Sequence, residues 1–283
     1  MMGTDPQPGW LWGAVAAWLV LWALNIVLAR RVRWLVPVVF GIAVVILWEG
    51  IVRGFGVPEV ILPAPSVVAV TFANSTSLLW GDFVQTILRG ALPGYVMGAV
   101  AALVVAVLID RSPFLTRGLL PIGNFVAALP IVGIAPIMVT WFGFGWQSKA
   151  AVVFAMVFFP VLINAVAGLT AADRMQRDLM RTYGAGYWQT LVKLRMPAAM
   201  PFIFNGLKIA TTLALIGAIV AEFFGSPTRG MGFRISTAVG SLALPLVWAH
   251  IVVAALAGTV FFGLVTAAER HVTFWHPSHR RRR

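Results

Sequence analysis

The chain has 283 residues, of which 60% are hydrophobic and only 11% are charged, whereas soluble proteins carry about 25% charged residues. This composition excludes an ordinary soluble globular protein and indicates an integral membrane protein. The absence of cysteine excludes disulfides, thiolate metal ligands and a cysteine nucleophile, and the net charge of +12 has to be interpreted from its distribution along the chain.

Seven apolar segments are long enough to cross the ~30 Å hydrocarbon core of a bilayer as helices that rise about 1.5 Å per residue. They lie at about residues 11–29, 34–52, 85–109, 119–140, 150–170, 201–222 and 246–268. Glycine and proline are scattered within long apolar runs, without the alternation of barrel strands. We therefore predict an all-α integral membrane protein with about seven transmembrane helices.

The first segment has two interpretations. Residues 1–29 could be a signal peptide, but basic residues do not precede the apolar run; Arg30, Arg31 and Arg33 follow it. A retained helix with its amino terminus outside fits this pattern better. We predict an additional transmembrane helix in residues 1–33, followed by the main membrane domain in residues 34–283.

Two parts of the central chain are interrupted by proline and glycine. The stretch from residue 54 to residue 83 is expected to lie along the outer surface, partly as an interfacial helix. The fourth apolar segment contains Pro121, Pro130 and Pro136, each of which removes a backbone donor. Ordinary transmembrane proline usage would explain any one of them, but three together favour a kinked or partly unwound helix that lines a path.

The basic residues indicate the topology. If the polar stretch at 178–197 is cytoplasmic and the segments alternate, 16 of the 21 Lys and Arg residues lie inside; the exceptions are Arg53, Arg89, Lys149, Arg229 and Arg234. This bias follows the positive-inside rule and places the amino terminus outside and the basic carboxyl-terminal tail inside. The tail is expected to attract anionic membrane lipid, and no nucleic-acid partner is predicted.

The polar stretch DLMRTYGAGYWQTLVKLRMP at 178–197 has the pattern of two short helices. Residues 174–183 can form the first, and Gly184 permits a sharp turn. Residues 187–196 can form the second, with one face composed of Trp188, Leu191, Val192 and Arg195. Pro197 is expected to end this second helix.

The spacing of this stretch resembles the EAA loop, E-A-A-x3-G-x9-I-x-L-P, of ABC importer permeases. Asp178, Leu179 and Met180 take the E-A-A positions, Gly184 the glycine, and Leu194 and Pro197 the ends of the motif. Segments such as ALPIVGIAPIMVTWFGFGWQSK at 128–149, AEFFG at 221–225 and RGMGF at 229–233 are similar to the nitrate, sulfonate and taurine branch of these permeases. The resemblance implies a type I importer permease core, here preceded by one extra helix.

The resemblance also implies the partners. A coupling loop at about residues 171–200 would dock on a cytoplasmic ATPase subunit through Asp178, Leu179, Met180, Gly184, Trp188, Leu194 and Pro197. An extracytoplasmic solute-binding protein and a second permease copy, forming a homodimer, would complete the transporter in the bacterial plasma membrane. The alternative for this loop is an interfacial segment held by lipid headgroups.

The chain itself is predicted to be no enzyme and to bind no cofactor. It has no GxxxxGK[ST] phosphate-binding loop, so that ATP and Mg²⁺ would be bound by the partner ATPase subunits. Its histidines, His250, His271, His276 and His279, do not have the paired spacing of metal ligands. We predict neither catalytic residues nor a metal site.

Polar and aromatic residues in or beside the apolar segments are candidates for the substrate path: Trp141, Phe144, Asn164, Asn205 and Glu222. Each has a structural alternative. Glu222 could instead pair with a nearby arginine, the two asparagines are better explained by interhelical hydrogen bonds, and the aromatic residues by a membrane-interface belt. Lys208 is expected to be a snorkelling anchor or the partner of a carboxylate.

The cargo stays open at this point. An anion such as nitrate, a sulfonate or taurine, an aromatic acid, or a heterocycle such as a thiamine precursor would each fit the resemblance. The rival functions are an ion-coupled secondary transporter and a membrane-embedded enzyme. The first would need titratable residues near mid-membrane and an inverted repeat, and the second a buried catalytic cluster; the sequence shows none of these.

Overall fold

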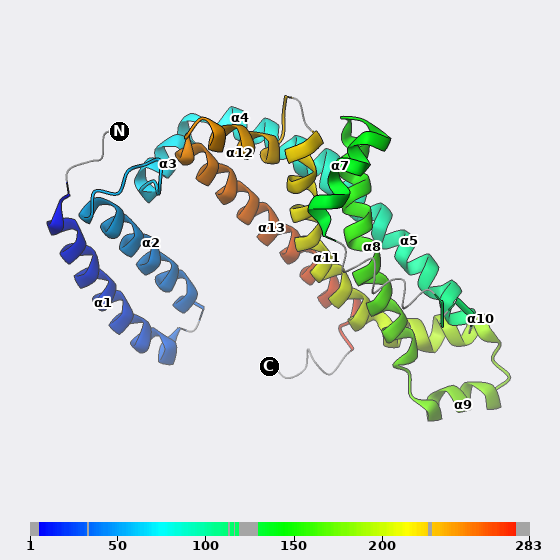
Figure 1. Ribbon diagram of the computed structural model, residues 1–283. Helices are drawn as coiled ribbons and strands as arrows, with labels where there is room; N and C mark the ends of the chain where they lie inside the picture. The colour runs from blue at the N-terminus through cyan, green and yellow to red at the C-terminus, as the bar shows by residue number, and fades with distance from the viewer. Residues whose placement is uncertain are drawn as a thin grey trace. The chain divides into compact units, whose positions relative to one another are not determined.

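A computed structural model describes residues 6–32, 34–112, 114–115, 117–118, 130–225 and 228–275. All regular secondary structure in these residues is helical (Figure 1). In chain order the elements are α1 (Pro8–Arg31), α2 (Val36–Gly54), α3 (Pro65–Asn74), α4 (Thr76–Phe83), η1 (Val84–Ala91), α5 (Leu92–Arg111), α7 (Ile131–Phe142), α8 (Trp146–Thr170), α9 (Arg174–Thr182), α10 (Tyr187–Thr190), η2 (Leu191–Arg195), α11 (Met196–Gly225), α12 (Met231–Gly240) and α13 (Leu244–Val272).

Six helices within the described residues are long and apolar enough to cross a membrane: Pro8–Ala29, Val36–Gly54, Thr76–Arg111, Trp146–Thr170, Tyr187–Gly225 and Leu244–Val272. They correspond to six of the seven predicted segments and confirm an all-helical membrane protein. For the fourth segment, residues 119–129 lie outside the described part of the chain. Its remainder is α7, which begins directly after Pro130 and contains Pro136.

The chain packs as two compact units. The first comprises the described residues of Met1–Trp80 and of Arg234–Val252. In it, α1 and α2 form an antiparallel hairpin (Figure 1), which closes where two glycines of α2 meet α1. A Cβ on Gly50 would lie 2.0 Å from the Cβ of Ala14, and one on Gly54 would lie 2.7 Å from the Cβ of Leu11. Small residues thus allow the two backbones to pack closely, as is typical of membrane helices.

Polar contacts hold α3 against the end of α2 in this first unit. The Glu49 carboxylate accepts hydrogen bonds from the backbone N–H of Ser66 at 2.9 Å and from its hydroxyl at 2.7 Å, and it pairs with Arg53. Arg53 also lies over the ring of Trp10 in α1, 5.0 Å from its centroid. The predicted interfacial stretch therefore contains two short helices, α3 and α4, and one of them is tied to the hairpin.

The second unit comprises the described residues of Gly81–Phe233 and of Val253–Arg283. Its core lies between α5, α8 and α11, which run side by side (Figure 1). Fully buried Val153, Val157 and Val161 of α8 form the centre of this core. Glycines again set the spacing: a Cβ on Gly94 of α5 would lie 2.6 Å from the carbonyl oxygen of Ala150.

Two π-helical segments change the predicted helix ends. η1 joins α4 to α5, giving one helix over Thr76–Arg111, and η2 joins α10 to α11, giving one helix over Tyr187–Gly225. The prediction that Pro197 ends the second loop helix is therefore wrong: the helix continues past it. The π-helical segment η2 ends at Arg195, two residues before Pro197. Its wider hydrogen-bond pattern, seen in the bond from the Met196 N–H to the Leu191 carbonyl, changes the turn that leads into the proline.

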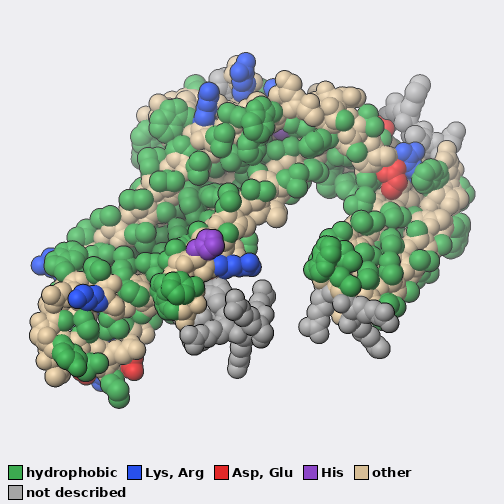
Figure 2. Space-filling view, turned by 180° about the vertical axis from the view of Figure 1, so that it is seen from behind, with side chains coloured by type: hydrophobic (Ala, Val, Ile, Leu, Met, Phe, Trp, Pro, Cys, Tyr) green, Lys and Arg blue, Asp and Glu red, His purple; other side chains and the backbone are tan. Residues whose placement is uncertain are grey.

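Hydrophobic side chains cover most of the face seen in Figure 2, and charged side chains are sparse there. Large apolar residues are exposed along α1, α2, α5 and α13, for example Trp22, Phe40, Val104 and Leu264. So much exposed apolar surface would be unfavourable in water, whereas the hydrocarbon of a bilayer can solvate it.

Candidate functional site

The first helix of the polar loop, α9, carries an exposed apolar stripe. Asp173 caps its start by accepting a hydrogen bond from the N–H of Met175 at 3.4 Å. Met175, Leu179 and Tyr183 follow at four-residue spacing and so lie on one side of the helix. Their side chains are 78%, 56% and 80% exposed, although the rest of the helix is mostly polar. Such a stripe on a polar helix is a surface that a partner can cover.

The turn after α9 depends on Gly184. Its φ of +66° lies in the left-handed region, and the N–H groups of Gly184 and Ala185 donate to the carbonyls of Arg181 at 2.9 Å and Met180 at 3.0 Å. This is the hydrogen-bond pattern of a Schellman motif, which ends a helix at a left-handed glycine. The sharp turn predicted at Gly184 is thus present.

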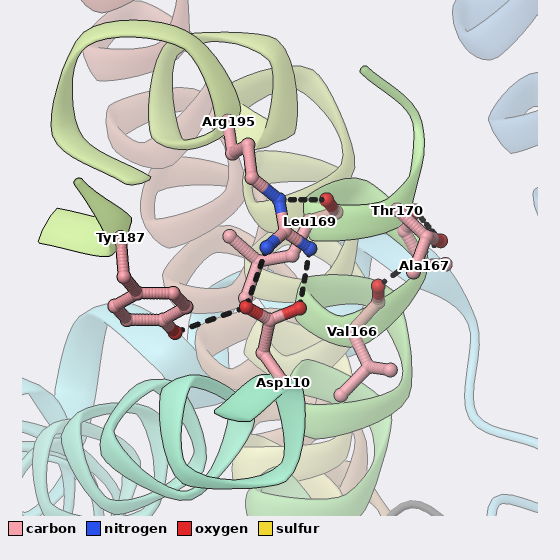
Figure 3. A network of polar contacts seen from close by, with 7 residues as sticks. All are labelled: Asp110, Val166, Ala167, Leu169, Thr170, Tyr187 and Arg195. Carbon is pink, nitrogen blue, oxygen red and sulfur yellow. Dashed lines mark hydrogen bonds and ion pairs between the residues drawn. The ribbon is translucent and has the colours of Figure 1, made fainter. Parts of the chain in front are cut away.

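The second loop helix buries one edge and exposes another. Leu191 is buried, whereas Trp188 and Val192 are exposed, and the guanidinium of Arg195 points into the protein (Figure 3). The prediction that these four residues share one face is therefore wrong in part. The inward edge runs along Tyr187, Leu191 and Arg195, each four residues from the next, and the outward residues form the neighbouring edge.

A buried ion pair fastens this helix to the membrane helices (Figure 3). The two terminal nitrogens of Arg195 donate to the two carboxylate oxygens of Asp110 near the end of α5, one of them at 2.7 Å. The Tyr187 hydroxyl donates to the same carboxylate at 3.0 Å, and Arg195 Nε donates to the carbonyl of Leu169 near the end of α8 at 3.0 Å. With side chains only 14% and 6% exposed, Arg195 and Asp110 form a bidentate, partly desolvated pair.

Sequence reasoning missed Asp110. The available signal was an acidic residue at the end of an apolar segment, next to Arg111, among residues assigned to the basic cytoplasmic side. Arg111 itself adds to the junction, since its guanidinium lies 5.7 Å from the ring centroid of Tyr187 and 5.9 Å from that of Trp188.

The remaining predicted coupling residues lie on or near the surface of the loop. Asp178 is exposed and makes only a loose contact of 3.6 Å with Arg181. Met180, Leu194 and Pro197 are half-buried, the last in the first turn of α11.

The predicted path residues do not form one site. Asn205 of α11 donates to the side-chain oxygen of Asn164 of α8 at 3.1 Å, which is the interhelical hydrogen bond considered for them. Trp141 and Phe144 are exposed at the turn between α7 and α8, about 30 Å along α8 from Asn164 at 1.5 Å per residue. Glu222 is buried, and it accepts hydrogen bonds from the Thr86 hydroxyl and the Gly232 N–H.

A groove of about 450 Å³ adjoins Asn205 and is lined by Asn205, Lys208, Ile209, Thr212, Leu213 and Phe262. Lys208 donates to both carboxylate oxygens of Glu269, at 2.9 and 3.1 Å, so that the carboxylate partner considered for it is Glu269. Within the described residues no cluster of His, Cys, Asp and Glu could hold a metal ion.

These features define a class of protein. It is an all-helical, multi-pass membrane protein with a loop of two short helices. The second of these helices continues into the long apolar helix α11 and is bonded through Arg195 to α5 and α8. Residues 94–274 match the family model described as binding-protein-dependent transport system inner membrane component. The chain belongs to this family of ABC importer permeases.

Three relatives illustrate the range of the family. The chain is 32% identical to the riboflavin transport system permease protein RibX of Chloroflexus aurantiacus, over 82% of this chain and 87% of the relative. It is 30% identical to the formylaminopyrimidine transport permease protein ThiX of Halalkalibacterium halodurans, over 87% and 98%. It is 28% identical to the putative aliphatic sulfonates transport permease protein SsuC of Bacillus subtilis, over 88% and 91%.

Family membership settles the general function. The chain is the permease subunit of a binding-protein-dependent ABC importer in the inner membrane. It is not an enzyme: ATP is hydrolysed by a separate subunit, and permeases of this family bind no cofactor themselves. Its partners are ATPase subunits and a solute-binding protein.

Proposed function

We propose that this permease moves a small solute from its binding protein into the cytoplasm by alternating access, and that the loop from α9 to η2 receives the force from the ATPase subunits. One observation supports this most strongly. The second loop helix continues into α11, and the Arg195–Asp110 pair fastens it to α5. A displacement of the loop is therefore a displacement of membrane helices.

The docking surface in this proposal is the apolar stripe of Met175, Leu179 and Tyr183, continued by Trp188 and Val192 of the second helix. All five side chains are more than half exposed, and an amphipathic helix of this kind suits a hydrophobic groove on a partner. The alternative occupant is the bilayer surface, which also attracts a basic helix with an apolar stripe. Binding to the ATPase subunit in detergent, without bilayer lipid, separates the two.

The turn at Gly184 tests the coupling. Gly184→Val places a β-branched side chain at φ +66°, a backbone conformation that costs an L residue roughly 1–2 kcal/mol of conformational free energy. Gly184→Asn is the matched control, because asparagine tolerates this conformation. We expect the valine variant to lose uptake while ATP hydrolysis persists, and the asparagine variant to keep most uptake. Normal ATP-driven uptake by Gly184→Val, at normal expression, would contradict the proposal.

We propose that the loop lies in the cytoplasm, with the amino terminus outside and the carboxyl terminus inside. The support is the distribution of 16 of the 21 Lys and Arg residues on the loop side. Single-cysteine variants can test this, since the chain has no cysteine of its own. In intact cells a membrane-impermeant thiol reagent should label Gln147→Cys but not Thr182→Cys. The opposite labelling would show that the loop lies outside the cytoplasm and would contradict this topology.

The solute path is proposed to follow the groove beside α11. Asn205 and Thr212 are exposed within this long apolar helix, and polar groups facing lipid at that depth are costly. A water-filled path or a second permease copy is a better environment for them. Because one chain supplies only one side of such a path, we propose a homodimer, which native mass spectrometry of the purified complex can test.

The groove favours an uncharged, hydrogen-bonding ring compound as cargo. The charge of Lys208 is neutralised by Glu269, Asn205 and Thr212 are neutral, and Phe262 offers an aromatic surface. Relatives named for riboflavin and formylaminopyrimidine transport fall in this class, whereas the one named for sulfonates does not. A thermal-shift screen of the cognate binding protein with flavins, pyrimidines, sulfonates and nitrate tests this, and stabilisation by an oxyanion alone would overturn it.

The domain assignment also remains a proposal. The family match begins at residue 94, so the role of residues 1–33 as a helix added before a permease domain in residues 34–283 rests on the sequence pattern. A chain that lacks residues 1–33 should still assemble with the ATPase subunits. Loss of assembly would make α1 part of the permease core.

A further inference from the structure

A second buried polar cluster lies in the same three-helix unit, at the opposite end of α8 from the Arg195 contact. Its side chains are Thr86 of η1, Lys149 of α8 and Glu222 of α11, each no more than 2% exposed. Asp82 of α4, also 2% exposed, accepts a hydrogen bond from the Gly230 N–H at 2.9 Å, and the N–H groups of Met231 and Gly232 complete the cluster. We call these groups the distal cluster.

Glu222 and Thr86 are bonded to each other and to the turn before α12. The Thr86 hydroxyl lies 2.8 and 3.0 Å from the two carboxylate oxygens of Glu222 and accepts from the N–H of Met231 at 2.8 Å. Glu222 also accepts from the N–H of Gly232 at 2.9 Å. Since the carboxylate is enclosed and bonded in this way, it is unavailable to a solute in this conformation.

Lys149 connects the start of α8 to the end of α11. Its ammonium donates to the carbonyls of Phe144 at 2.7 Å, Gly145 at 3.0 Å and Gly225. The three donors of a lysine ammonium are thereby all used. Removing any one partner would leave a buried polar group unsatisfied, so the cluster is a well-defined connection between helices.

The local backbone is adapted to this cluster. Thr86 lies in the π-helical segment η1, and π-turns inside α-helices are frequent at functional positions. A Cβ on Gly230 would lie 2.4 Å from a carboxylate oxygen of Glu222, and one on Gly232 would lie 2.1 Å from the carbonyl oxygen of Ile219. Only glycine at both positions lets the turn approach the carboxylate.

The two polar junctions are about one membrane thickness apart. From Thr86 to Asp110 the helix rises roughly 35 Å, and from Arg195 to Glu222 roughly 40 Å, at about 1.5 Å per residue. The hydrocarbon core is ~30 Å thick. The continuous helices Thr76–Arg111 and Tyr187–Gly225 are therefore joined at both membrane faces, and α8 is joined to the helix Tyr187–Gly225 at both.

We propose that the distal cluster makes α5, α8 and α11 move as one rigid body, so that a displacement of the cytoplasmic loop reaches the outer face undiminished. Thr86, Lys149 and Glu222 are positioning residues in this proposal: they act through the helices they join and not by contact with the solute. It rests on the proposed role of the loop but assigns a new site, remote from that loop.

Spin labels test the rigid body directly. Nitroxides on Gln147→Cys and Phe223→Cys, both exposed positions, report the distance between the outer ends of α8 and α11. In the complete transporter, with labelled chain diluted in unlabelled chain, we expect the same distance distribution without nucleotide and with ATP plus vanadate. A shift between these states in the chain that is otherwise unsubstituted would overturn the proposal.

Function is tested by removing one hydroxyl. Thr86→Val keeps the size of the side chain but leaves Glu222 and the Met231 N–H without this partner; Thr259→Val is the control, because that exposed hydroxyl only donates to Ala255 of its own helix at 2.8 Å. In Thr86→Val we expect the stimulation of ATP hydrolysis by the solute-loaded binding protein to fall about fivefold or more, given the cost of an unsatisfied buried group. The distribution of distances between the two labels should also broaden. Thr86→Ser should restore both.

The outcomes are distinguishable from a failure of the proposed loop function. If Gly184→Val uncouples but Thr86→Val is stimulated normally and keeps a narrow label distance, the distal cluster has no such role. If Gly184→Val transports normally, the loop proposal fails, whatever the labels report. If Thr86→Val does not accumulate in the membrane, the label distance in the chain with Thr86 intact still decides.

Discussion

Arg195 forms a bidentate ion pair with Asp110, a residue 85 positions earlier in the chain, at the point where the loop from α9 to η2 meets α5 and α8. Both side chains are largely removed from solvent. In that environment the pair matters less for its net energy than for what its loss would leave behind, namely a buried charge without a partner.

Asp110→Asn should therefore be strongly destabilising and uncoupling. Breaking a buried pair by neutralising one member costs about 3–5 kcal/mol. We expect a clearly lower melting temperature of the purified permease and lost uptake. The control is Asp178→Asn, whose contact with Arg181 is exposed and 3.6 Å long; such pairs contribute about 0–1 kcal/mol, so the melting temperature should not change. Equal melting temperatures for both variants would argue against a structural role of the Asp110 pair.

The exposed stripe of α9 predicts a separation of binding from stability. Leu179→Ala removes an exposed apolar side chain, so we expect the thermal stability to be unchanged. Binding to the ATPase subunit in detergent should be several-fold weaker, because truncating an anchor residue at an interface costs roughly 1–2 kcal/mol of binding free energy. Arg181→Ala, on the opposite side of the same helix and 83% exposed, is the control. The stripe is not the docking surface if both variants bind equally well.

The hairpin of α1 and α2 predicts different costs for two chemically identical changes. Gly50→Ala would place a Cβ 2.0 Å from that of Ala14, whereas Gly41→Ala, in the same helix, meets nothing within 4 Å. Overpacking of this kind costs about 1–3 kcal/mol, while an alanine at an open helical site is favourable by up to about 1 kcal/mol. Cysteine cross-linking between α1 and α2 should fall for Gly50→Ala and be unaffected by Gly41→Ala. Equal cross-linking in the two variants would show that the helices do not meet at Gly50.

The sequence predicted those features that depend on neighbouring residues. The transmembrane helices follow from apolar runs of sufficient length, and the turn at Gly184 follows from the one residue type that adopts φ +66° without strain. In both cases the physical cause lies within a few residues of its effect.

Features that depend on distant parts of the chain could not be predicted in this way. No local sequence motif links Asp110 to Arg195. Likewise, the residues around Glu222 do not indicate that its partners are a threonine 136 positions earlier and a glycine N–H. The prediction that Pro197 ends the helix was wrong for a related reason. A proline ends an isolated helix, but here the packing of α11 in the core and the π-turn of η2 allow the helix to continue past it.

The glycine contacts of the first hairpin bear on how the protein is made. Ala14 and Gly50 are separated by a short stretch of chain, so closing the hairpin costs little entropy. Its interface needs only residues that have already been synthesised when Gly54 enters the bilayer. The hairpin can thus settle in the membrane while the remaining helices are still being translated, and the order of synthesis then becomes the order of assembly.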